Sequence, residues 1–305
     1  MNSYGYKVWG GFVFIAAIWG STWLAIRIGL ESMDPFFSSG IRFLIAAAIL
    51  YLIIKYRRIQ VPLDKRSLYL YLYIGLFSFA VPYGLVYWGE QRIPSGLASI
   101  IFASFPFFVA LFSKIFLPDE EIGFYKIIGI IIGFIGIIII FSEGISLDMN
   151  SDFAGMAAIG ASALIQASAG VAVKKYGKHI DPFSTIALPT LIGGILLLIV
   201  SFLSEDFSAQ QFDAKGILSA LYLGAFGTVA TFTTFYWLLK KMNIAILSLN
   251  TFLTPIIAVI LGWLIMGEVL SINTILGSAC VLIGILFANF KGLINFVLNK
   301  NEAKA

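Results

Sequence analysis

The sequence has little of the side-chain chemistry that catalysis and metal binding require. Its 305 residues include one histidine and one cysteine. His179 is expected in a loop beside Lys178, and Cys280 lies in an apolar run. These two residues cannot form a metal cluster, a nucleophile–base pair or a disulfide, and the chain has no phosphate-binding loop. We therefore expect no enzyme activity, no ATP hydrolysis, no cofactor and no bound metal.

Charged residues are scarce as well. They make up 12% of the chain, while 60% of the residues are hydrophobic and the mean hydropathy is +0.96. So few polar groups cannot cover a soluble globule, and the composition predicts a polytopic all-α membrane protein. A helix needs about 20 apolar residues to cross a bilayer. Ten such runs are present, at residues 9–30, 35–55, 67–89, 95–117, 125–142, 152–174, 182–203, 215–238, 245–267 and 273–290.

Lysines and arginines are distributed unevenly between the two ends of these runs. If the N-terminus is cytoplasmic, the cytoplasmic segments contain sixteen of the 20 Lys and Arg residues. Only Arg27, Arg92 and Lys215 lie at outer ends, and Arg42 lies within a span. This positive-inside bias predicts that both termini are cytoplasmic. It also accounts for the basic pI near 9.0, so no nucleic-acid partner is expected.

Landmarks in the first half of the chain recur in the second half. The matched pairs keep an offset of 147 to 149 residues: Asp34 with Asp181, Tyr87 with Tyr236, Pro106 with Pro255, Glu120 with Glu268, and Gly129 with Gly277. A nearly constant offset indicates an internal duplication. The predicted units are residues 9–142 and 152–290, followed by a polar cytoplasmic tail at residues 291–305.

Each predicted unit has five spans, and this odd number decides how the units are related. The second unit must enter the membrane from the opposite face, so the two are inverted around a pseudo-two-fold axis in the membrane plane. Inverted repeats are the usual construction of alternating-access transporters, whose substrate site lies near the membrane midplane between the halves. The sequence therefore predicts a central substrate site.

Several short motifs give the chain a family resemblance. These are Trp19 to Thr22 in the first span, Asp34-Pro35 and Arg42 to Ala46 in the second, and Gly267-Glu268 before the last. With the prolines of the fourth and ninth spans, their order over residues 9–290 resembles the EamA-type members of the drug/metabolite transporter superfamily. The resemblance implies a ten-helix inverted-repeat transporter of the bacterial inner membrane, often an exporter of amino acids or related metabolites. The first copy departs from the glycine–glutamate junction and reads Pro118-Asp119-Glu120.

Arg42 is the most unusual residue in the predicted spans. It lies seven residues past Pro35, roughly 10 Å below the outer end of its helix, in a run that is otherwise apolar. A cation there costs about 3 kcal/mol or more unless it is hydrated or paired. One interpretation is that its guanidinium faces a cavity and binds a carboxylate or another anionic group through two N–H donors. The other is that Arg42 snorkels outward or pairs with Glu31, Glu90 or a free main-chain carbonyl.

The third span carries aromatic residues on one helix face. Phe79, Tyr83 and Tyr87 are spaced by four residues, and Pro82 interrupts the hydrogen bonding of the helix. An aromatic stripe with hydroxyl groups beside a broken helix suits an amphipathic organic substrate, but it equally suits helix packing. Trp19, near the middle of the first span, has the same two interpretations.

Polar side chains in other spans complete the predicted substrate site: Ser99, Gln166, Asn250 and Thr254. An amide inside the membrane needs several hydrogen-bond partners, so Gln166 and Asn250 are expected either to bind substrate or to join neighbouring helices. Pro82, Pro106 and Pro255 are expected to break the third, fourth and ninth helices, and nearby hydroxyls can bond the carbonyls that the prolines leave free.

Acidic residues are absent from the middle of every predicted span. The nearest are Glu90, expected at an outer rim, and Glu268, at the junction of the last two spans. Because proton-coupled antiport normally needs a buried titratable carboxylate, the sequence favours facilitated export or exchange. Glycines in the fifth and tenth spans indicate close helix packing, within a monomer or in a homodimer.

The predicted function is a secondary carrier of small organic metabolites that works by alternating access. Amino acids fit best, because a carboxylate would bind Arg42 and an aromatic or apolar side chain would contact Trp19, Tyr83 and Tyr87. The alternative is a drug-like, nucleotide or sugar-phosphate substrate, although a phosphorylated ligand would call for more than one cation in the spans. An integral membrane enzyme acting on lipid is opposed by the missing catalytic cluster. The expected partners are a small-molecule substrate and the lipid bilayer.

Overall fold

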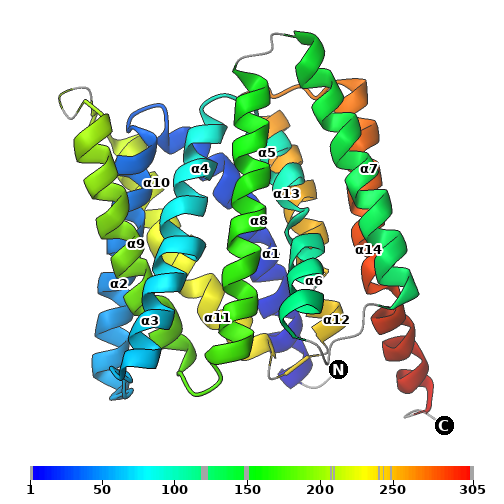
Figure 1. The fold of residues 1–305 in the computed structure, drawn as a ribbon, viewed down its shortest axis with the longest axis horizontal. Helices are drawn as coiled ribbons and strands as arrows, with labels where there is room; N and C mark the ends of the chain where they lie inside the picture. The colour runs from blue at the N-terminus through cyan, green and yellow to red at the C-terminus, as the bar shows by residue number, and fades with distance from the viewer. Residues whose placement is uncertain are drawn as a thin grey trace.

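The protein is a bundle of helices that lie side by side (Figure 1). The computed structural model describes residues 3–117, 123–147, 151–206, 208, 210–239, 241–242, 244–247 and 249–302. No β-strand occurs among these residues, and the all-α prediction is confirmed. The departure at Pro118-Asp119-Glu120 lies outside the described residues.

The helices follow the order of the expected spans. The first half of the chain contains α1 (Ser3–Gly29), α2 (Pro35–Arg57), α3 (Lys65–Ile74), the π-helix η1 (Gly75–Ala80), α4 (Val81–Glu90), α5 (Ser95–Phe102), α6 (Phe105–Phe116) and α7 (Phe124–Leu147). The second half contains α8 (Asp152–Tyr176), α9 (Pro182–Ser204), α10 (Ala214–Gly224), the π-helix η3 (Ala225–Ala230), α11 (Thr231–Leu239), α12 (Ile244–Leu247), α13 (Asn250–Met266) and α14 (Ile272–Glu302).

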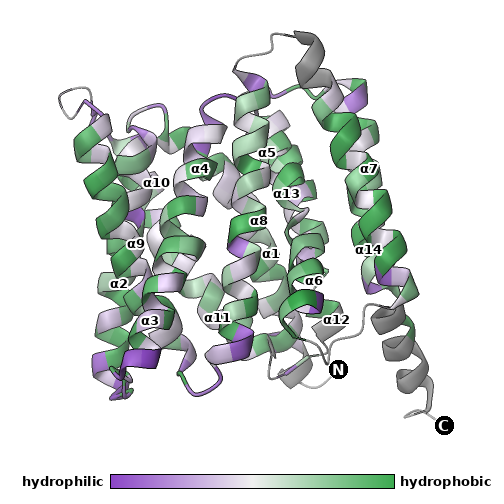
Figure 2. Ribbon diagram, in the orientation of Figure 1, coloured by the Kyte–Doolittle hydropathy of each residue, from purple (hydrophilic) through white to green (hydrophobic). Residues whose placement is uncertain are grey.

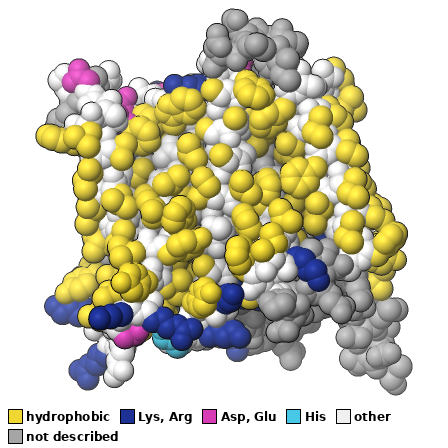
Figure 3. All heavy atoms as spheres, viewed as in Figure 1, with side chains coloured by type: hydrophobic (Ala, Val, Ile, Leu, Met, Phe, Trp, Pro, Cys, Tyr) yellow, Lys and Arg dark blue, Asp and Glu magenta, His cyan; other side chains and the backbone are white. Residues whose placement is uncertain are grey.

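Length and composition make most of these helices suitable for crossing a membrane. Within the described ranges, nine helical runs are long and apolar enough. This count joins α3, η1 and α4 into one run, α5 and α6 into another, and α10, η3 and α11 into a third. The expected ninth span is instead divided into the short α12 and the apolar α13, which has 17 residues. Hydrophobic side chains cover the middle of the bundle, while Lys and Arg on the visible face gather mainly at the end that carries the termini (Figures 2 and 3).

The course of the chain shows the inverted relation between the halves. Both termini lie at the same end of the bundle, and α7 and α8 are connected at the opposite end (Figure 1). The second half therefore starts from the end at which the first half finishes, and α8 runs antiparallel to α1. That the terminal end faces the cytoplasm stays a prediction.

Glycines bring α7 and α14 into close contact. A Cβ atom on Gly136 would lie 2.5 Å from the carbonyl oxygen of Gly277, and one on Gly284 would lie 2.5 Å from the carbonyl oxygen of Gly129. Such contacts are possible only without side chains at these positions. The small-residue faces of the fifth and tenth spans thus pack against each other within one chain.

Both halves contain a π-helix at the same place. The π-helices η1 and η3 are each 6 residues long, and they begin at residues 75 and 225. Pro82 follows η1 by two residues, whereas Phe232 holds the corresponding place after η3. The π-helix therefore does not depend on the proline. Such segments are rare and often occur at functional sites.

Two glutamates of the second half cap helices of the first half. The carboxylate of Glu268 accepts hydrogen bonds from the main-chain N–H groups of Ser95, at 2.8 Å, and Gly96, at 3.0 Å, in the first turn of α5. Glu205 does the same in the first turn of α2, at 2.7 and 2.9 Å. Free N–H groups and the helix dipole both favour a carboxylate there. These caps tie the two halves together at the end opposite the termini.

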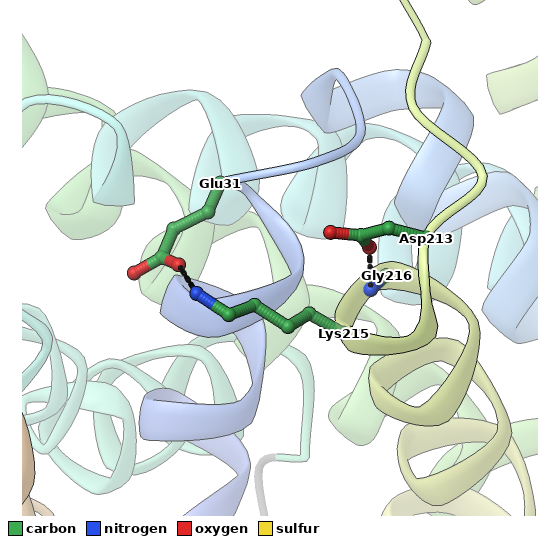
Figure 4. Close-up of polar contacts among 4 residues, drawn as sticks. All are labelled: Glu31, Asp213, Lys215 and Gly216. Atoms are coloured by element: carbon green, nitrogen blue, oxygen red, sulfur yellow. Dashed lines mark hydrogen bonds and ion pairs between the residues drawn. The ribbon is translucent and has the colours of Figure 1, made fainter.

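Figure 4 shows a further link at this end of the molecule. Nζ of Lys215 lies 2.7 Å from Oε2 of Glu31, and both side chains are exposed. Beside them the carboxylate of Asp213 accepts a hydrogen bond of 2.8 Å from the N–H of Gly216 and so caps α10. This bond holds the pKa of Asp213 below its usual value.

Candidate functional site

The candidate site is built around Arg42, the eighth residue of α2. Its side chain is only 2% exposed. Nε donates a hydrogen bond to Oγ1 of Thr228 in η3, at 3.3 Å, and Nη1 donates to the hydroxyl of Tyr87 in α4, at 3.4 Å. Since α2 and α4 belong to the first half of the chain and η3 belongs to the second, Arg42 lies where the two halves meet.

Aromatic rings surround the guanidinium group. Cζ of Arg42 lies 4.8 Å from the ring centroid of Tyr83 and 5.3 Å from that of Phe43. The ring of Phe43 makes edge contacts with Phe79, at 5.2 Å, and with Tyr83, at 4.8 Å. The faces of these rings attract a cation. Of the predicted site residues, Tyr83 and Tyr87 therefore contact Arg42, and Phe79 packs behind them against Phe43.

The guanidinium keeps unused hydrogen-bond donors. Arginine has five N–H donors, and within the described part of the chain Arg42 makes only the two long bonds above. Glu31 is bonded to Lys215 instead, and the carboxylate oxygens of Glu90 have no hydrogen-bond partner among the described residues. With 2% exposure the side chain does not snorkel outward. In this structure, therefore, Arg42 neither snorkels outward nor forms an ion pair with Glu31 or Glu90.

Gly227 and Thr228 bring η3 close to Arg42. A Cβ atom on Gly227 would lie 3.6 Å from Nη2 of Arg42 and 2.9 Å from Cγ2 of Thr22. The hydroxyl of Thr228 also donates a hydrogen bond of 3.0 Å to the carbonyl of Leu223. That bond orients a lone pair of the hydroxyl toward Nε of Arg42. Thr228 was not among the predicted site residues, because a threonine in an apolar run resembles many others.

Gln166 makes a hydrogen bond to the main chain of the third span. Its Nε2 donates a hydrogen bond of 2.9 Å to the main-chain carbonyl of Ser78 in η1. Pro82 lies four residues after Ser78 and has no N–H with which to bond that carbonyl in α-helical register. The side chain of Gln166 thus joins α8 to the third span, which is the packing interpretation of this residue.

Trp19 lies in a second aromatic group, on α1 and α11. Its ring centroid is 5.8 Å from that of Phe232 and 5.5 Å from that of Phe235. Trp19 is half-buried, and its main-chain carbonyl accepts a hydrogen bond of 2.7 Å from the hydroxyl of Thr22. Because Thr22 borders Gly227, the Trp19 group lies about one helical turn from the Arg42 group.

Ser99 and Thr254 bond main-chain carbonyls of their own helices. The hydroxyl of Ser99 donates to the carbonyl of Gly96 at 2.6 Å, and that of Thr254 donates to the carbonyl of Asn250 at 2.9 Å. Asn250 itself is 2% exposed, and its Nδ2 donates to the carbonyl of Phe12 at 3.3 Å. Its Oδ1 has no hydrogen-bond partner among the described residues. Asn250 therefore keeps a free acceptor, whereas no described contact of Ser99 or Thr254 reaches Arg42.

The three prolines occupy different places relative to their helices. Pro106 is the second residue of α6, where a missing N–H is tolerated. Pro82 is the second residue of α4, which continues from η1 without an interruption. The fourth span is interrupted just before Pro106, between α5 and α6. Pro255 lies inside α13, which continues through it, and the interruption comes earlier, between α12 and α13. The expected break at Pro255 is therefore displaced toward the N-terminus.

Glu90 is the last residue of α4, at the end of the third span where it was expected. Its side chain, however, is completely buried, with 0% exposure. It follows Tyr83 and Tyr87 on the same face of α4, and that spacing is the one sequence signal that connects it to the site. No acidic residue is thereby placed in the middle of a span, but a carboxylate at the end of a span is shielded from solvent.

A separate hollow of about 670 Å³ opens between α3, α6 and α8. Its lining includes Arg66, Tyr73, Phe116, Ser168 and Tyr176. None of the predicted site residues lines it, so this hollow is distinct from the Arg42 group.

Comparison with known proteins gives a consistent result. A sequence model described as the EamA-like transporter family matches residues 8–142 and 153–290. The chain is 30% identical to the "Uncharacterized transporter YoaV" of Bacillus subtilis, over 93% of this chain and 97% of that protein. It is 32% identical to "Protein PagO" of Salmonella typhimurium, over 90% of each chain.

Two further comparisons concern a bacterial inner membrane protein and a solved structure. The chain is 31% identical to the "Uncharacterized inner membrane transporter YedA" of Escherichia coli K12, over 87% of this chain and 84% of that protein. A crystal structure with 18% sequence identity superposes with a TM-score of 0.68, covering 94% of this chain and 97% of that chain. The latter similarity concerns the fold alone.

Proposed function

The chain belongs to the EamA-like transporter family, and from this premise we propose that it carries small organic metabolites, amino acids first among them, by alternating access. It is a multi-pass membrane protein of the transporter type. We place it in the bacterial inner membrane with both termini in the cytoplasm. The Lys and Arg residues at the terminal end and the name of the Escherichia coli relative support this placement.

One observation carries the proposal: Arg42 is buried between the two halves and has N–H donors that no described residue uses. A buried cation without an ion-pair partner is costly and usually functional in a membrane span. The neighbouring rings and hydroxyl groups hold the guanidinium of Arg42 in place and leave N–H donors for a ligand. A carboxylate fits these donors, because guanidinium and carboxylate groups bind through two parallel hydrogen bonds.

The surroundings of Arg42 indicate the rest of the substrate. Tyr83 and the Trp19 group provide half-buried aromatic surface close to the guanidinium. Such surface suits an apolar or aromatic side chain. A phosphorylated substrate would be better served by several cations, and Arg42 is the one lysine or arginine deep in a predicted span. The amino-acid class follows from this combination.

Alternating access follows from where the site lies. Residues 9–142 supply Arg42 and Tyr87, and residues 152–290 supply Thr228. If the halves rock against each other, the contact between Arg42 and Thr228 changes and the site opens toward one side at a time. One chain supplies every residue of this site, so a monomer is sufficient.

Counterflow uptake in proteoliposomes tests the proposal. Purified protein is reconstituted in vesicles loaded with unlabelled amino acid, and the uptake of labelled phenylalanine, leucine and glutamate is compared with that of a nucleoside and a lipophilic cation. We expect uptake of at least one amino acid and its loss in Arg42→Ala. Arg42→Lys should recover only part of the uptake, because an ammonium group does not reproduce the planar fork of donors.

Lys215→Ala is the matched control, since Lys215 is an exposed cation at the same end of the bundle. It should transport as the wild-type protein does. Uptake of the lipophilic cation alone, unchanged in Arg42→Ala, would contradict the amino-acid assignment. Unfolding of Arg42→Ala, judged by its elution in size-exclusion chromatography, would assign Arg42 to structure instead.

A further inference from the structure

Glu90 ends α4 with a carboxylate that the fold buries and leaves without a partner. Its side chain has 0% exposure, and neither Oε1 nor Oε2 has a hydrogen-bond partner among the described residues. Nη1 of Arg27 bonds the main-chain carbonyl of Glu90, not its carboxylate. Buried carboxylates in proteins are normally paired or hydrogen-bonded, so this one needs an explanation.

The charged groups around Glu90 come from several elements. Arg27 on α1, Arg42 on α2 and Glu268 after α13 all act on it electrostatically, and Tyr87 lies on its own helix. Glu268 accepts hydrogen bonds from two main-chain N–H groups of α5. The groups that act on Glu90 are thus one carboxyl group and two guanidinium groups.

Two forms of Glu90 follow from these surroundings. With a proton, the carboxyl group is neutral and is compatible with burial next to Glu268. Without one, its charge needs donors, and the unused N–H groups of Arg42 are within its electrostatic reach. An ionised Glu90 would then turn toward the same donors that a substrate carboxylate needs.

Building on the proposed function, we propose that Glu90 is a proton-binding site, and that its ionised form competes with the anionic group of the substrate for Arg42. Proton and substrate therefore bind to the same form of the protein. Tyr87 connects Arg42 with Glu90, since it accepts a hydrogen bond from Arg42 and precedes Glu90 on one face of α4. This geometry makes α4 the element that connects the two sites.

The sign of the pH effect is fixed by this competition. Acidification neutralises Glu90, frees Arg42 and strengthens substrate binding; alkalinisation does the opposite. Binding linkage is reciprocal, so bound substrate also strengthens proton binding. For a single coupled proton, the half-saturation concentration rises at most about tenfold per pH unit.

Counterflow with labelled phenylalanine, measured at stepped pH that is equal on both sides, tests the competition. We expect the half-saturation concentration to fall on acidification in the wild-type protein. In Glu90→Gln, which is similar in shape and always neutral, it should be low and independent of pH. Glu31→Gln is the matched control, because Glu31 is an exposed carboxylate at the same end, and it should keep the wild-type slope. A Glu90→Gln variant with the wild-type pH profile would overturn the proposal.

Infrared spectroscopy of the purified protein tests the proton site without any substrate. A protonated carboxyl group absorbs at a carbonyl frequency distinct from that of a carboxylate, and the band shifts in deuterium oxide. We expect such a band in wild-type protein near neutral pH, its loss at alkaline pH and its absence from Glu90→Gln. No band at neutral pH in the wild type would overturn the proton site. A band in a protein that transports no amino acid would retain the proton site and reject the carrier assignment.

Discussion

The side-chain amide of Gln166 on α8 donates a hydrogen bond of 2.9 Å to the main-chain carbonyl of Ser78 in η1. This is the carbonyl that Pro82 cannot bond in α-helical register. The amide from a neighbouring helix thus supplies the donor that the proline lacks. A polar residue in one half of the chain is in this way explained by a proline in the other half.

Gln166→Leu should therefore destabilise the fold by about 1 kcal/mol, because it removes the donor of a half-buried carbonyl. The loss should be smaller in a Pro82→Ala background, where the new N–H is available to Ser78. Thermal unfolding in detergent of the four proteins of this double-mutant cycle measures the difference. Equal losses in both backgrounds would show that Gln166 does not compensate for Pro82.

Thr228→Val should weaken substrate binding while the fold is kept. The hydroxyl that orients Nε of Arg42 is removed, and the shape of the side chain is nearly preserved. One hydrogen bond contributes about 0.5–1.5 kcal/mol, so the half-saturation concentration should rise about twofold to thirteenfold. Thr231→Val is the control, since among the described residues the hydroxyl of Thr231 bonds only main-chain carbonyls, those of Gly227 and Thr228 in the preceding turn. A change of the same size in both variants would argue against a special role for Thr228.

Glu268→Ala should lower stability by about 1 kcal/mol, as the loss of a helix cap does. The same is expected for Glu205→Ala at the first turn of α2. Glu31→Ala removes only an exposed ion pair and should change stability by about 0–1 kcal/mol. Thermal unfolding compares the three, and no difference between Glu268→Ala and Glu31→Ala would contradict the capping role.

Gly136→Ala should separate α7 from α14. Its Cβ would meet the main chain of Gly277, which cannot move as a flexible side chain does. Overpacking of this kind costs about 1–3 kcal/mol. Gly10→Ala, where nothing lies within 4 Å of the new Cβ, should be tolerated. If Gly136→Ala is as stable as Gly10→Ala, α7 and α14 can move apart at little energetic cost, and the prediction is contradicted.

Acid should loosen the start of α10. The hydrogen bond from Gly216 lowers the pKa of Asp213, so its stabilising effect is present above the unfolded-state pKa of about 3.9 and is lost as the pH falls through the folded-state pKa. Hydrogen exchange at the Gly216 amide should therefore speed up in acid beyond its intrinsic rate. In Asp213→Asn this extra, pH-dependent step should disappear. Its persistence in that variant would assign it to another group.

Much of the fold could be predicted because long apolar runs are sufficient to define membrane helices. The first residues of α2 and α9 could be predicted, because Asp34-Pro35 starts one helix and Asp181-Pro182 starts the other. The π-helices could not be predicted in this way, because η3 has no proline to mark it and both segments read as ordinary apolar helix. The break before α13 was predicted too late for a related reason, since Pro255 can be accommodated inside a helix.

The candidate site could be predicted less completely. Periodicity placed Tyr83 and Tyr87 on one face, and the rarity of a cation in a span singled out Arg42. Burial of Glu90 depends on elements distant in the sequence, among them α1 and α8, which pack against α4. Its position at the end of an apolar run does not indicate these neighbours. Thr228 contacts Arg42 across 186 residues, which no local pattern reveals.

The two π-helices also have a historical meaning. A π turn contains one residue more than an α turn, so each records an insertion into an ordinary helix. Because η1 and η3 occupy the same place in both halves, the parsimonious account is that one insertion occurred in a single ancestral gene before that gene was duplicated. Pro82 then belongs to one descendant copy alone. The ancestral five-helix unit would then have carried the π-helix already.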